Sequence, residues 1–111
     1  MEVYYGGASG VDGSNADVFT TGTPGVPGGD ESYAEFGEVA GTADFDGDGT
    51  MDLAIGAPYH SAGSTFNAGT VIVLPGGTNG VTTKHAQAWS QDSKHILGTP
   101  AQFDGFGASV D

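Results

Sequence analysis

Apolar residues occur in short runs along the chain, and no stretch has the 3.6-residue apolar period of an amphipathic helix. Gly, Pro and Asn cluster between these runs, which is typical of strands joined by tight turns. The clearest run covers residues 70–74 (TVIVL). The pattern predicts an all-β chain with strands at residues 3–5, 16–20, 38–44, 51–55, 70–74 and 86–89, and a seventh opening at 108–110.

The chain carries an internal repeat with a period of 70 residues. Residues 1–41 align without a gap on the last 41 residues, and aromatic positions stay in register, with Phe19 matching Trp89 and Tyr33 matching Phe103. The positions that recur as identities are Val3, Gly6, Gly7, Gly10, Val11, Ala16, Gly28, Phe36 and Gly37. A fixed period of this kind indicates a solenoid, an array or a propeller. One full period contains four predicted strands, which is the strand content of one propeller blade.

Composition excludes several classes of function. The 111 residues include 14 acidic and two basic side chains, giving a formal net charge of −12, and no Cys. Such a chain repels phosphate backbones and anionic lipid surfaces, so we expect neither nucleic acid nor membrane partners. The longest aliphatic run, 71–74, is far shorter than a membrane span. Without Cys there is no disulfide framework, thiolate nucleophile or Cys-ligated metal.

Oxygen ligands recur at alternate positions of an acidic loop. Asp44, Asp46, Asp48 and Asp52 take relative positions 1, 3, 5 and 9, and the carbonyl of Thr50 can contribute from position 7. Four carboxylates within nine residues repel one another unless a cation lies among them. Calcium accepts six to eight oxygens in a flexible cage, whereas magnesium demands stricter octahedral geometry and zinc prefers His or Cys. The loop therefore predicts a Ca²⁺ site, and the alternative is a solvated acidic turn.

An EF-hand is a poorer interpretation of this loop. An EF-hand needs a Glu at position 12 and a helix on each side. Position 12 is Ile55, and the following residues end in Pro58.

Several motifs together resemble one FG-GAP repeat, the repeat of the integrin α-subunit β-propeller and of many bacterial extracellular proteins. They are Phe36-Gly37, the acidic loop, residues 52–58 (DLAIGAP) and residues 69–77 (GTVIVLPGG). Residues 106–110 resemble the opening of a further repeat. The resemblance implies a four-stranded blade whose calcium loop joins strands one and two. It places Asp44, Asp46, Asp48, Thr50 and Asp52 at the ligand positions.

This resemblance predicts about one and a half propeller repeats. Residues 1–34 would form the C-terminal half of one blade, 35–104 a complete blade with the calcium loop, and 105–111 the start of the next. The second loop is missing, because Asp111 aligns with Gly41. We therefore expect other blades or copies of the same chain as partners, associated end to end as a homo-oligomer or within a parent propeller.

The function implied by the resemblance is a calcium-binding, non-catalytic interaction or adhesion scaffold, in the extracellular space or at the cell surface. No catalytic residues and no organic cofactor are predicted. One alternative is a lectin-like module in which Trp89, Tyr59 or Tyr5 stacks on a sugar. Another is a non-catalytic part of a secreted hydrolase. The protein or glycan partner stays open.

The remaining aromatic and histidine residues are assigned structural roles. We expect two matched aromatic pairs in the core, Phe36 with Phe106 and Phe19 with Trp89. The three histidines share no metal-ligand spacing and are expected to be exposed: His60, His85 and His95.

Overall fold

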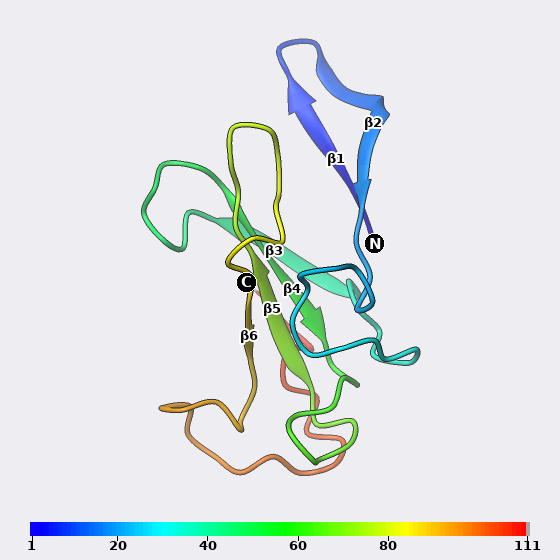
Figure 1. The fold of residues 1–111 in the computed structure, drawn as a ribbon, viewed down its shortest axis with the longest axis vertical. Coiled ribbons are helices and arrows are strands. Elements are labelled where there is room, and N and C mark those ends of the chain that lie inside the picture. Colours follow the sequence, from blue (N-terminus) through cyan, green and yellow to red (C-terminus); the bar gives the residue numbers. More distant parts are fainter. Residues whose placement is uncertain (111) are drawn as a thin grey trace.

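A computed structural model describes residues 1–110, which form two antiparallel β-sheets (Figure 1). The first is a hairpin of β1 (Glu2–Gly7) and β2 (Gly10–Val18). The second has the order β3-β4-β5-β6, and its strands are β3 (Val39–Ala43), β4 (Asp52–Ala57), β5 (Thr70–Leu74) and β6 (Gln87–Trp89). The described residues contain no helix, and hence none that could cross a membrane. The predicted all-β class is confirmed.

The predicted seventh strand at 108–110 is wrong. In this part of the chain the structure has one parallel bridge, between Gly69 and Phe106, and no ladder. The segment crosses one face of the four-stranded sheet, where a Cβ added to Gly56 would collide with the backbone oxygen of Gly107. A β-strand forms by hydrogen bonding to the edge of a neighbouring strand. This segment lies across the face of the sheet, so it forms no ladder. Residue 111 of the expected next blade lies outside the described residues.

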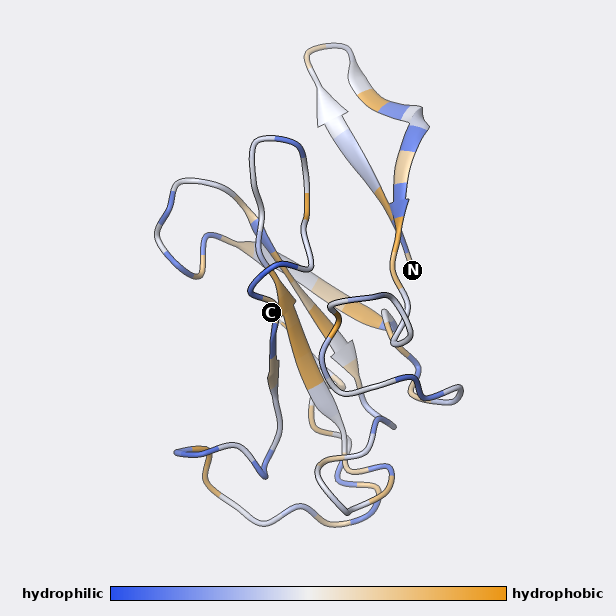
Figure 2. Cartoon of the chain, in the orientation of Figure 1, coloured by the Kyte–Doolittle hydropathy of each residue, from blue (hydrophilic) through white to orange (hydrophobic). Residues whose placement is uncertain are grey.

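The core forms on one face of the four-stranded sheet. Side chains alternate along β5, so that Ile72 and Leu74 are completely buried. Directly opposite them on β4 lie Ile55 and Leu53, which are also buried. We call these four residues the inner face. Figure 2 shows the hydrophobic colouring concentrated on the central strands.

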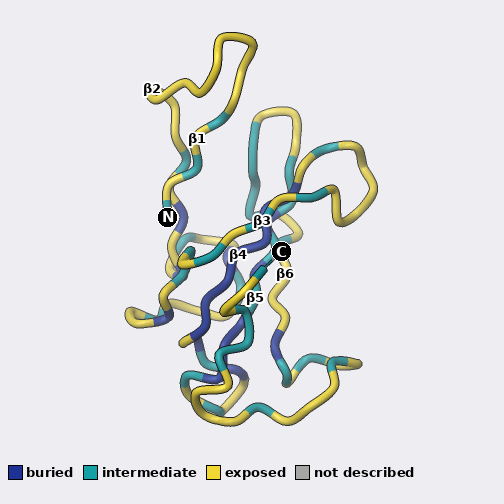
Figure 3. The backbone as a smooth tube through the Cα atoms, turned by 180° about the vertical axis from the view of Figure 1, so that it is seen from behind, coloured by how far each residue is buried: buried dark blue, intermediate teal, exposed yellow. Residues whose placement is uncertain are grey.

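The N-terminal segment covers the inner face. Phe19 and Val26 are buried in the same cluster as the four inner-face residues, and Met1, Val3 and Phe36 pack against it. Met1 and Phe19 exchange both backbone hydrogen bonds at 2.9 Å, which extends the hairpin ladder into the core. The far end of the hairpin is exposed (Figure 3).

The structure reproduces the 70-residue repeat in its hydrogen bonding. Two facing pairs recur at this offset: Glu2–Val18 with Ile72–Ala88, and Val3–Asp17 with Val73–Gln87. The turns that follow also match, with N···O distances of 3.1 Å for Thr23 to Thr20 and 3.0 Å for Ser93 to Ser90. The β1–β2 hairpin is therefore the structural counterpart of β5–β6.

Candidate metal centre

The acidic loop connects β3 to β4 at one end of the sheet. Ala43 pairs with Asp52 across the two strands, so residues 44–51 must reverse the chain between them. Two glycines allow this, because Gly47 and Gly49 have φ angles of 79° and 91°, a region that side chains with a Cβ rarely adopt.

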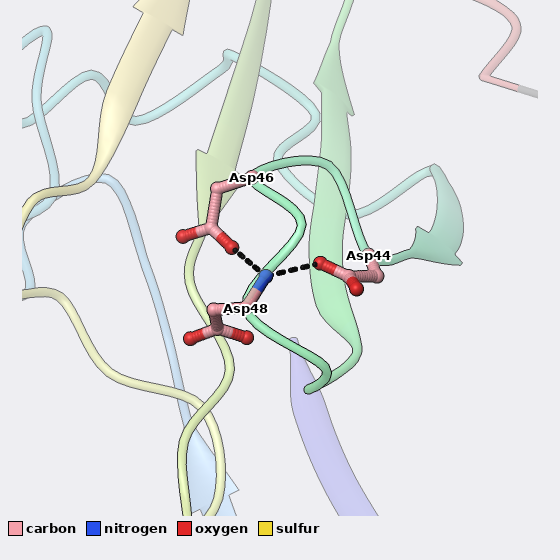
Figure 4. A group of neighbouring side chains, drawn as sticks. All are labelled: Asp44, Asp46 and Asp48. Carbon is pink, nitrogen blue, oxygen red and sulfur yellow. Dashed lines mark hydrogen bonds between the residues drawn. The ribbon is translucent and has the colours of Figure 1, made fainter.

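Three aspartates converge in this loop (Figure 4). Carboxylate oxygens of Asp44, Asp46 and Asp48 all lie within 4.8 Å of one another, and the three side chains are exposed. Calcium–oxygen distances are about 2.4 Å, so two ligands on opposite sides of one ion are about 4.8 Å apart. The three oxygens therefore fit within a single coordination sphere. The predicted cluster of Asp44, Asp46 and Asp48 is present and can hold a metal ion.

Backbone groups hold the first of these carboxylates in place. Asp44 Oδ1 accepts hydrogen bonds from the N–H groups of Gly47 (2.7 Å) and Asp48 (3.1 Å), and its Oδ2 accepts one from Gly49 (3.0 Å). Asp46 Oδ1 accepts a further bond from the Asp48 N–H at 3.0 Å. The loop is thus folded around its own carboxylates.

Thr50 stabilises the charged form of the third carboxylate, that of Asp48. The Thr50 hydroxyl and N–H both donate to Asp48 Oδ1, at 2.6 and 2.8 Å. These bonds lower the pKa of Asp48 below its ordinary value of 3.8. Each pair of charges at this spacing repels by about 1 kcal/mol even in bulk water, so a divalent cation would stabilise the loop.

Asp52 lies apart from the exposed cluster. Its side chain is only 2% exposed, its Oδ2 accepts the N–H of Phe45 and its Oδ1 accepts the N–H of Gly76, both at 2.8 Å. These bonds tie the acidic loop to the segment after β5. Sequence reasoning did not find this bracing role, because Gly76 is distant in sequence. The ligand roles assigned to Asp52 and to the Thr50 carbonyl stay predictions.

The expectation that the histidines are exposed is wrong for His60, which is 2% exposed. Its Nδ1 lies 2.9 Å from the Ser61 carbonyl oxygen, and its Nε2 lies 3.3 Å from that of Gly29 and 3.5 Å from Glu31 Oε2. Glu31 also accepts the Ser61 N–H at 2.7 Å and the Ser61 hydroxyl at 2.6 Å. This cluster joins the N-terminal segment to the blade. Gly29 and Glu31 are about 30 residues from His60 and Ser61 in the sequence, so no local sequence motif could predict this cluster.

The matched aromatic pairs do not share one environment. Phe19 is 6% exposed and belongs to the core, whereas Trp89 is 39% exposed on the edge strand β6. Phe36 packs against the core and Phe106 is half-buried. The expectation of core packing therefore fails for Trp89.

Tyr5, a candidate for sugar stacking, is engaged in structural hydrogen bonds. Its hydroxyl donates to Asp17 Oδ2 at 2.6 Å and accepts the Val81 N–H at 2.8 Å. This residue links the hairpin to the segment after β5. Tyr59 is partly exposed.

Comparison with known protein families decides between an isolated acidic turn and a family motif. Residues 36–74 match the family described as FG-GAP repeat. This segment is an FG-GAP repeat. The match contains β3, the acidic loop, β4 and β5, and the FG-GAP repeat implies a propeller blade. No curated protein and no solved structure gives a significant match to the chain.

The FG-GAP match agrees with the resemblance noted from the sequence. Its first residues, Phe36-Gly37, lie against the core through Phe36 and precede β3. In the structure the matched segment continues into β6, which completes a four-stranded sheet. The proposed division into 1–34, 35–104 and 105–111 stays a prediction.

Proposed function

We propose that this chain is a calcium-stabilised, non-catalytic propeller segment that serves as an extracellular interaction scaffold. The observation that carries the proposal is the convergence of Asp44, Asp46 and Asp48 oxygens within 4.8 Å in the loop of an FG-GAP repeat.

The donor set favours calcium over other ions. All three clustered ligands are carboxylates, and the loop contains neither His nor Cys, which zinc prefers. The loop is exposed and built on two glycines, which suits the flexible cage of calcium better than the strict octahedron of magnesium. We expect Asp44, Asp46 and Asp48 to bind the ion, joined by the Thr50 carbonyl and Asp52.

Calcium would act here as a structural ion. The loop joins two neighbouring strands, β3 and β4, and is braced by Asp52, so binding would resist opening of the sheet at this end. With a Kd of about 10 μM and about 1 mM free calcium, binding would add roughly 2.7 kcal/mol to stability. This is a large fraction of the marginal stability of a small domain.

Two observations support a role without catalysis. The buried His60 lies beside Ser61, but the Ser61 hydroxyl donates to Glu31 and not to the imidazole. The Thr70 hydroxyl lies 3.4 Å from His60 Nδ1, but Thr70 is buried, so no exposed hydroxyl is paired with a histidine base there. The acidic loop, residues 44–51, is exposed at its three clustered carboxylates and contains no Ser, Cys or His. An extracellular or cell-surface location agrees with the calcium requirement, since free calcium is abundant there.

Thermal unfolding with calcium and with chelator tests the proposal. We expect the wild-type chain to melt several degrees higher with calcium, and Asp48→Ala to abolish the difference. Asp12→Ala is a matched control, because Asp12 is also exposed and accepts the N–H and hydroxyl of Ser14 at 2.9 and 2.7 Å. Identical wild-type melts with and without calcium would contradict the proposal.

A further inference from the structure

The four-stranded sheet has a second apolar face, on the side opposite the inner face. Val71 and Trp89 lie directly opposite each other on β5 and β6, and Val73 follows two residues along β5. We call these three residues the outer face. Val71 and Val73 are half-buried and Trp89 is 39% exposed. Beside them lies a hollow of about 230 Å³, whose lining includes Ala54, Phe45 and Val110.

The same surface occurs once more in the chain, where it is covered. At the 70-residue offset, Met1, Val3 and Phe19 of the N-terminal segment are the counterparts of Val71, Val73 and Trp89. These counterparts pack on the inner face of the blade, and Phe19 is only 6% exposed there. Within the chain, the N-terminal residues that correspond to the outer face are therefore packed on the inner face of the blade.

The segments that follow each surface repeat as well. A Cβ added to Gly37 would lie 2.8 Å from Met1 Cβ, and a Cβ added to Gly107 would lie 3.0 Å from Val71 Cγ2. Gly37 and Gly107 are themselves 70 residues apart and have φ angles of 88° and 87°. The backbone at Gly107 thus lies against Val71 of the outer face. In the same way, the backbone at Gly37 lies against Met1 of the N-terminal segment.

The hairpin presents an exposed counterpart of the inner face. Glu2 and Val18 lie opposite each other, on the same side of the hairpin as Tyr4, and they correspond to Ile72, Ala88 and Leu74 of the blade. Tyr4 is 46% exposed and Val18 is 60% exposed. We call Tyr4 and Val18 the hairpin patch.

We propose that the outer face of one chain docks on the hairpin patch of a second copy. The contact would repeat between chains the packing that is observed within the chain. It is heterologous, since two different surfaces meet, so copies associate head to tail. This inference rests on the propeller-blade interpretation of the proposed function and names the partner of that blade.

Charge sets the conditions for this association. Each copy has a formal net charge of −12, so two copies repel each other at long range. The proposed contact itself is apolar apart from the Tyr4 hydroxyl and the Glu2 carboxylate, which accepts a hydrogen bond from that hydroxyl at 2.6 Å. Screening by salt should therefore strengthen the association, whereas it would weaken one held by ion pairs.

Sedimentation velocity of single variants and their mixture tests the proposal. At about 100 μM chain and about 0.5 M salt, where repulsion is largely screened, the wild type should form dimers and larger species. Trp89→Lys removes the outer face and Val18→Lys the hairpin patch, so each variant alone should be monomeric. Their equimolar mixture retains one intact contact, which joins one copy of each, and should form dimers only.

Leu97→Lys is the matched control, because Leu97 is an exposed apolar residue outside both surfaces and its change adds the same charge. It should associate as the wild type does. A monomeric wild type, a mixture that stays monomeric, or an equal loss in Leu97→Lys would overturn the proposal. Calcium-dependent melts of the same variants report the proposed function separately, since neither Trp89 nor Val18 belongs to the acidic loop.

Discussion

Replacing Asp52 by Ala should destabilise the chain even when no calcium is present. Asp52 is 2% exposed, and its two carboxylate oxygens accept the backbone N–H groups of Phe45 and Gly76 at 2.8 Å each. Removing the carboxylate leaves both donors without this partner. The loop would then lose its attachment to the segment after β5.

The size of the effect follows from these two bonds. A hydrogen bond to a charged group contributes about 1.5–3 kcal/mol, so the loss of two should cost about 3–6 kcal/mol. Domains of this size are stable by about 5–15 kcal/mol, which makes such a loss a large fraction of the total. Asp52→Asn keeps one acceptor oxygen and should lose about half as much.

Urea unfolding in chelator, followed by circular dichroism, measures this difference. Asp46→Ala is the control within the same loop, because Asp46 is exposed and accepts one hydrogen bond, from the Asp48 N–H. Its removal should change the free energy of unfolding in chelator by less than about 1 kcal/mol, since repulsion within the cluster also falls. Equal losses for Asp52→Ala and Asp46→Ala in chelator would refute the bracing role.

Other predictions follow from the fold and from the charge. Burial raises the pKa of Glu31, but the bonds donated by Ser61 and the nearby His60 outweigh it and hold that pKa below 4.5. The Glu31 carboxylate therefore stabilises the fold above pH 4.5, and the stability difference between wild type and Glu31→Gln should shrink as the pH falls below 4.5. Gly56→Ala should lower the melting temperature, because its Cβ would meet the Gly107 oxygen; an unchanged melt would contradict the observed contact. The chain should pass unretained through a heparin column at about 0.15 M salt, and retention would contradict the repulsion expected from its charge of −12.

Local sequence signals predicted the strands that carry their own apolar alternation. Strand β5 has the bounds expected from its run at 70–74. Residues 10–15 (GVDGSN) carry no strand signal, but strand β2 begins at Gly10 and not at residue 16, because Gly10 and Val11 pair with Gly7 and Gly6 of β1. Pairing with a neighbouring strand, and not intrinsic propensity, sets that boundary.

In the candidate site, too, local sequence signals predicted some features, and others depend on partners far along the chain. Spacing within one loop was enough to bring Asp44, Asp46 and Asp48 together, because all three belong to a single turn. The burial of Asp52 and His60 depends on partners far along the chain, so no local pattern could reveal it. Likewise, the sequence repeat matched Phe19 with Trp89, but burial of each depends on what covers it in space.

Calcium titration of the chelator-treated chain by isothermal calorimetry tests the central claim most directly. We expect one calcium per chain, with a Kd of about 10 μM, in the wild type and in Asp12→Ala. Asp48→Ala, which removes one of the three clustered carboxylates, should show no binding in this range. Absence of binding by the wild type, or equal binding by Asp48→Ala, would contradict the assignment of the acidic loop as a calcium site.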